Sequence, residues 1–148
     1  MINYAAITAA LAAQLLANSG VSALLKVQSI ERGGFVNVDA DQCPWVGVYR
    51  GAVKFEPRTL GSINNWEAFP TIRILAQAAS YQSGSDCEDR LEALVKACHE
   101  AVLSDTTIGG TVDMVTGFTV DYSYREDERE TVHYQQAMIT LQIEVRTS

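Results

Sequence analysis

Histidine and cysteine are the side chains that most often act as bases, nucleophiles or metal ligands, and this chain of 148 residues has few of them. The cysteines are Cys43, Cys87 and Cys98, and the histidines are His99 and His133. They form no CxxC, HxxxH or HExxH motif, so no zinc site is expected. On one helix, Cys87 and Cys98 would lie about 16 Å apart, too far for a disulfide. We therefore expect small buried thiols in a reducing compartment.

Other catalytic and ligand-binding patterns are also missing from the sequence. It has no GxSxG nucleophile elbow, no GxxxxGK[ST] loop and no GxGxxG turn. Asp39-Ala40-Asp41 resembles the start of a calcium loop, but position twelve of that loop is Arg50 where a bidentate acid is needed. Asp113 and Asp121 would lie about 27 Å apart on a strand, too far for a glycosidase pair. We predict no catalytic residue, no cofactor and no metal.

Composition narrows the class of protein further. The chain has eleven basic and eighteen acidic residues and a net charge of −7, which is unfavourable for binding the phosphate backbone of a nucleic acid. The chain is 47% hydrophobic and 20% charged, which excludes a disordered tail. No apolar run reaches the roughly 18 residues of a membrane helix. No basic residue precedes Lys26, so we expect no secretory signal. The length predicts one domain over residues 1–148.

Hydrophobic periodicity predicts the elements of the first two thirds of the chain. Residues 3–17 read as a helix capped by Asn3, and a Gly20 cap separates it from a short helical turn at 21–25. Strands are predicted at 27–31 and 35–38, around Gly33-Gly34, and then at 45–55 and 66–77. A capping box from Ser85 to Glu88 predicts the start of an amphipathic helix over 86–103.

The last third of the chain has the clearest pattern. Residues 112–124 and 137–145 alternate as two strands, and the charged stretch between them predicts an antiparallel hairpin with a solvated tip. Tyr122 and Tyr124 share the parity of Val112, Met114 and Val120, so we expect them to pack in the core. The whole order predicts an α+β fold, with a mostly antiparallel sheet, a long C-terminal hairpin and helices packed on one face.

One segment carries a family resemblance. Cys43-Pro44-Trp45-Val46-Gly47-Val48-Tyr49 resembles an "lPaixVy" strand start. It follows a short N-terminal helix and precedes a long strand, one amphipathic helix and a terminal hairpin with a charged turn. In this order and length the chain resembles, over nearly its whole extent, the tail terminator proteins of long-tailed bacteriophages, a family of tail completion or minor tail proteins.

The resemblance implies a structural virion protein and not an enzyme. It implies a ring, commonly of six subunits, that caps the tail tube, ends its polymerisation and provides the surface for head joining. The implied partners are copies of the chain itself, the tail tube protein and a head-completion or neck protein. DNA passes through the lumen without specific binding, and no membrane is involved. The implied location is the tail or neck of the virion, and the host cytoplasm during assembly.

The family supplies no catalytic positions, so interface candidates come from the residues themselves. The charged hairpin tip is one candidate, because it mixes both signs of charge, and a solvated loop is the alternative. Trp66 and Phe69 form the other, because large aromatics are favoured at interface centres, and burial in the subunit's own core is the alternative for at least one of them. The tip residues are Arg125, Glu126, Asp127, Glu128, Arg129 and Glu130.

Three other functions stay open at this stage. A head-completion or neck connector protein shares the size, the acidity and ring formation. A tail tube subunit would polymerise into long tubes instead of stopping at one ring. A small enzyme with an unfamiliar site is a further alternative, and substitution of His99 and His133 would test it.

Overall fold

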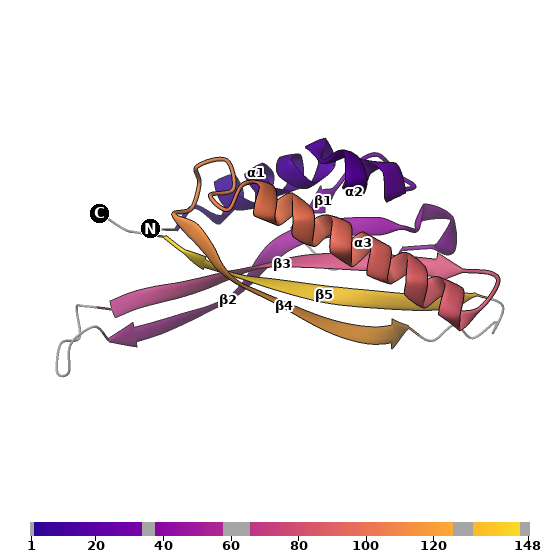
Figure 1. Cartoon of the computed structure of the whole chain (residues 1–148). Coiled ribbons are helices and arrows are strands. Elements are labelled where there is room, and N and C mark those ends of the chain that lie inside the picture. The colour runs from indigo at the N-terminus through magenta and orange to yellow at the C-terminus, as the bar shows by residue number, and fades with distance from the viewer. Residues whose placement is uncertain (1, 34–37, 58–65, 126–131, 146–148) are drawn as a thin grey trace.

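The computed structural model describes residues 2–33, 38–57, 66–125 and 132–145. Within these ranges it confirms the predicted α+β architecture: a five-stranded sheet with its helices on one face (Figure 1). The strand order is β1-β2-β3-β5-β4, and every neighbouring pair is antiparallel except β1 with β2. The predicted C-terminal hairpin is present as β4 and β5, with β4 at the edge of the sheet.

Asparagines cap the two helices near the start of the chain, and Asn18 caps an end of each. Helix α1 (Tyr4–Ala17) starts where the Asn3 side chain accepts a hydrogen bond from the Ala6 amide at 3.1 Å. Asn18 ends α1 and caps α2 (Ser19–Leu24), its side chain accepting from the Val21 amide at 3.1 Å. The predicted left-handed cap at Gly20 is wrong, because Gly20 lies inside α2 and Asn18 separates the helices.

The region before the first long strand differs most from prediction. Among the described residues of this region only Glu31–Arg32 forms a strand, β1, which pairs in parallel with β2 at Gly47 and Val48. The prediction of a strand over 27–31 is therefore wrong except at its last residue. The predicted strand at 35–38 falls largely outside the described residues. A short 3₁₀ turn, η1 (Ala40–Gln42), then leads into β2.

Strands β2 (Trp45–Pro57) and β3 (Trp66–Ser80) confirm the two predicted long strands. Strand β3 pairs with β2 from Trp66 to Gln77, with a register shift between Arg50 and Val53, and it pairs with β5 only from Thr71 onward. Pro70 is tolerated inside β3 because it lies just before the β5 pairing starts, where a missing amide costs no ladder bond on that side. The segments Val53–Pro57 and Trp66–Pro70 thus form a two-stranded extension of the sheet, which we call the β2–β3 arm.

Helix α3 (Gly84–Ser104) lies over the centre of the sheet, against β3 and β5 (Figure 1). It starts two residues earlier than the predicted capping box, because Ser83 is the N-cap and accepts from the Asp86 amide at 3.1 Å. Its buried stripe joins α1 and the inward residues of the sheet in one core. That core includes Ile7, Leu11, Leu15, Val46, Val48, Ile72, Ile74, Leu91, Leu94, Cys98, Ile139 and Leu141.

Strands β4 (Met114–Arg125) and β5 (His133–Glu144) form the last hairpin. A bulge between Val115 and Gly117 reverses the side-chain alternation of β4. Val115 therefore packs on the helix-covered core, and Met114 is 52% exposed. The prediction that Met114 points into the core is wrong for this reason.

The opposite face of the sheet has a smaller core built on Trp45. The indole packs with Val38, Cys43, Leu75 and Ala79. It also lies against Gly47, where a Cβ atom would come within 2.5 Å of Cη2 of Trp45. A side chain at position 47 would therefore displace the indole.

We expect Gly47→Ala to lower the free energy of unfolding by about 1–3 kcal/mol, the usual cost of overpacking a filled core. Urea denaturation measures the change. Gly84→Ala is the matched control, because the nearest atom to a Cβ at position 84 is 3.9 Å away and the free energy should change little. An unchanged midpoint for Gly47→Ala would show that the indole moves aside without loss.

Candidate interaction surfaces

The predicted hairpin tip lies mostly outside the described residues. Arg125 is the last residue of β4, where its backbone pairs with Tyr134. Residues 126–130, Glu126 to Glu130, are not described. The role of the tip as a contact therefore stays a prediction.

The two predicted aromatic residues lie together on the β2–β3 arm. Trp66 opens β3 opposite Pro57, and Phe69 pairs with Lys54. Phe69 is 42% exposed, and Phe55 on the other strand of the arm is 59% exposed. The arm and the Arg125 end of β4 lie at opposite ends of the sheet (Figure 1). Trp66 and Phe69 thus lie three positions apart on one strand, at the end of the sheet opposite Arg125.

Sequence reasoning missed an exposed aromatic pair on β4. Tyr122 is 60% exposed and Tyr124 is 78% exposed, so the prediction that they pack in the core is wrong. Their parity was read correctly, since Tyr122 pairs with the fully buried Ala137 of β5. Helix α3, however, contacts β3 and β5, so the end of the edge strand β4 extends beyond its cover. The sequence shows two tyrosines at alternate positions, but it does not show that their strand, β4, lies at the edge of the sheet.

These tyrosines line a groove between α3 and β4, which we call the α3–β4 groove. It holds about 380 Å³, and the helix contributes Glu88, Leu91 and Glu92 to it. Glu88 and Glu92 are one helical turn apart, and neither makes an ion pair with any described residue. The groove therefore combines two free carboxylates with two exposed phenol rings.

A second hollow lies at the other edge of the sheet, between α1 and the strands β1 and β2. This β1–β2 edge pocket holds about 470 Å³ and is lined by Tyr4, Ala5, Thr8, Arg32, Gly33, Tyr49 and Arg50. Its lining has two guanidinium groups and no carboxylate. Arg32 donates a hydrogen bond to the Ala5 carbonyl at 3.3 Å, and neither arginine has an ion-pair partner in the described part of the chain.

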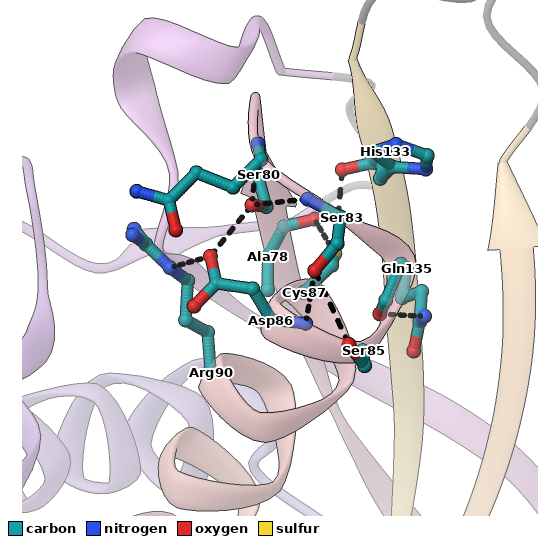
Figure 2. Close-up of polar contacts among 11 residues, drawn as sticks. Ala78, Ser80, Ser83, Ser85, Asp86, Cys87, Arg90, His133 and Gln135 are labelled. Carbon is teal, nitrogen blue, oxygen red and sulfur yellow. Dashed lines mark hydrogen bonds and ion pairs between the residues drawn. The ribbon is translucent and has the colours of Figure 1, made fainter.

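A polar network fixes the start of α3 and with it the position of Glu88 and Glu92. The buried Ser80 hydroxyl donates to Oδ2 of Asp86 at 2.6 Å, and Arg90 donates to the same oxygen at 2.9 Å (Figure 2). These contacts lower the pKa of Asp86 below its ordinary value of 3.8, the hydrogen bond from Ser80 contributing most. They hold the first turn of the helix against the end of β3.

The cysteines serve packing, as predicted: all three are buried, and none forms a disulfide with a described residue. The Cys87 thiol donates to the carbonyl of His133 at 3.3 Å and of Ala78 at 3.5 Å, joining α3 to β5 and β3 (Figure 2). Burial raises the pKa of Cys87, and it raises the pKa of Cys98 to about 12. Both thiols are therefore protonated at neutral pH, which makes them poor nucleophiles and poor metal ligands.

The histidines and acids form no metal-binding group within the described residues. His99 is exposed, with its ring centroid 4.4 Å from that of Phe118 on β4, and His133 is exposed at the start of β5. None of the helices in the described ranges has the length and hydropathy to cross a membrane.

Comparison with known proteins gives little beyond this geometry. No family model matches the chain, and no curated protein matches it. Among solved structures, a chain of the "Virion of native gene transfer agent (GTA) particle" is similar, with 14% identity, a TM-score of 0.47 and coverage of 93% of each chain. A likeness at this level carries no argument about function.

The Asp86 network predicts a pH dependence of stability. Because the pKa of Asp86 is lowered by folding, its contribution is complete above pH 3.8 and is lost as the pH falls through the folded-state pKa. We expect Asp86→Asn to be less stable than the wild type at neutral pH, and the difference to shrink below pH 3.8. Urea denaturation across this pH range measures it.

Asp89→Asn is the matched control, since it removes the same charge from an exposed neighbour on the same helix. It should stay close to the wild type at neutral pH. Equal losses of stability in the two variants at neutral pH would contradict a specific role for the Ser80–Asp86 hydrogen bond.

Proposed function

We propose that this chain is a non-enzymatic structural protein of a phage-like virion, and that it forms a ring that caps the tail tube, ends tail polymerisation and provides the head-joining surface. The proposal rests on the sequence resemblance and on the edges of the sheet. The observation that carries it is the long edge strand β4, which has no partner on its outer side in the described structure.

An open edge of this length favours association. Strand β4 has twelve residues and no prolines, and an edge strand with unpaired amides and carbonyls is a ready surface for another chain. The two edges of the sheet differ, because β4 is long and β1 has two residues. A contact between unlike edges is head-to-tail, and it closes into a ring when the rotation between subunits allows.

The two ends of the sheet then face different neighbours along the ring axis. One end carries the β2–β3 arm with Phe55 and Phe69 exposed, and the other is the end at which β4 finishes with Arg125. We assign the two ends to the tail tube protein and the neck protein. Six copies of an acidic chain would surround passing DNA with negative charge, so the duplex would not be held.

Light scattering coupled to size exclusion, followed by negative-stain imaging, tests the ring. We expect closed rings of one size, with or without magnesium to screen the acidic subunits. Added to polymerising tail tube protein, these rings should shorten the tubes. Long tubes formed by the chain alone would instead identify a tube subunit. Rings that bind tail-free, portal-bearing heads and ignore tubes would identify a neck protein.

The double variant Arg125→Glu/Arg129→Glu tests the tip as a docking contact. We expect rings to form normally and joining to a tail or head partner to fall, because reversed charge repels an electrostatically complementary surface. Pull-down with tubes and with tail-free heads measures joining. Arg125→Lys/Arg129→Lys keeps the charge and should keep joining. Full joining by the reversed variant would remove the tip from the interface.

A further inference from the structure

We propose that the surface around the α3–β4 groove of one subunit packs against the surface around the β1–β2 edge pocket of a second copy. In this contact Glu88 and Glu92 meet Arg32 and Arg50 of the neighbour. This inference rests on the proposed ring, and it names the contact that would hold the ring together. The occupant of the groove is thus another copy of the same chain.

The two surfaces lie where such a contact requires them. The groove is at the β4 edge and the pocket is at the β1 edge, which are the two ends of the strand order. Both lie on the face of the sheet that carries the helices, since α3 lines the groove and α1 lines the pocket (Figure 1). Side-by-side copies with their helices on the same side would bring the two together.

The charges of the two surfaces are opposite and uncompensated. Two carboxylates and no cation line the groove, whereas two guanidinium groups and no anion line the pocket. Glu31, the other residue of β1, alternates to the face opposite Arg32 and so does not neutralise it. Of the nearby cations on α3, Arg90 is already paired with Asp86 at 2.9 Å. Lys96, one turn after Glu92, makes no ion pair with a described residue.

The tyrosines make the groove more suitable for arginine than for lysine. Tyr122 and Tyr124 expose most of their side chains beside the two glutamates. A guanidinium group can stack on a phenol ring while its N–H groups donate to a carboxylate. The groove therefore offers both types of contact to the arginines of the pocket.

The sheet register fixes how the neighbour must be offset. Arg32 is level with Val48 of β2, which pairs with Ile74 of β3. Tyr122 is level with Ala137 of β5, which pairs with Ala76 of β3. Tyr124 is level with Ala78, and Arg50 is level with Ile72. The difference is thus two residues for the first pair and six for the second, about four on average, or ~13 Å along the strands. A ring accommodates such an offset when its strands are inclined to the ring axis, as strands are in closed barrels.

Charge reversal tests the contact by sedimentation velocity. The variant Glu88→Arg/Glu92→Arg gives a chain with two basic edges, and Arg32→Glu/Arg50→Glu gives a chain with two acidic edges. Each variant alone should lose ring formation, with association weakened by about tenfold or more. An equimolar mixture should assemble again, because each edge then faces its opposite. The quadruple variant, with the charges exchanged within one chain, should also form rings.

The matched control is Asp89→Lys/Glu100→Lys, which makes the same change of net charge on exposed positions of α3 outside the groove. It should assemble like the wild type, and circular dichroism should show every variant folded. Rings of the wild type together with rings of both reversed variants would overturn this contact and leave the proposed ring intact. A wild type that forms no ring, alone or on tail tubes, would overturn the proposed function and this contact with it.

Discussion

The packing of α3 across β3 and β5 is the constraint on which the rest of the structure depends. From Ile74 to Ser80 every residue of β3 is buried, so the strand has packed neighbours on both faces. The helix is held there by its apolar stripe, by the Cys87 thiol and by the Ser80–Asp86 hydrogen bond. Because one helix covers only the centre of the sheet, the end of β4 remains outside the cover. The α3–β4 groove, with Tyr122 and Tyr124 exposed in it, is the direct result.

The fold thus divides its surface by position. The centre of the sheet contributes to stability, because its thiols are buried and protonated and Asp86 is bonded to Ser80 and Arg90. The edges and ends carry the features that a partner could contact: free carboxylates at one edge, free guanidinium groups at the other, and exposed phenylalanines on the arm.

Much of this architecture was predictable from local pattern, because periodicity reports burial along one element. The long strands, α1, α3 and the final hairpin follow from it. Several of the errors concern relations between elements. Tyr122 and Tyr124 have core parity, but their exposure depends on which strand lies at the edge. The arginines of the β1–β2 edge pocket lie eighteen positions apart in sequence and meet only because β1 pairs in parallel with β2. A local prediction also failed where Asn18 and Gly20 were both possible caps. Asn18 ends α1 and starts α2, and Gly20 lies inside α2.

That shared asparagine has a dynamic consequence. Asn18 terminates α1 with its backbone amide and starts α2 with its side chain, so neither helix end is satisfied independently of the other. A fluctuation that releases Asn18 leaves orphan donors and acceptors in both helices at once. The two helices should consequently open as one unit, with amide protons at the junction exchanging at a common rate. Since α1 also lines the β1–β2 edge pocket, local unfolding of this unit would remove one wall of that pocket.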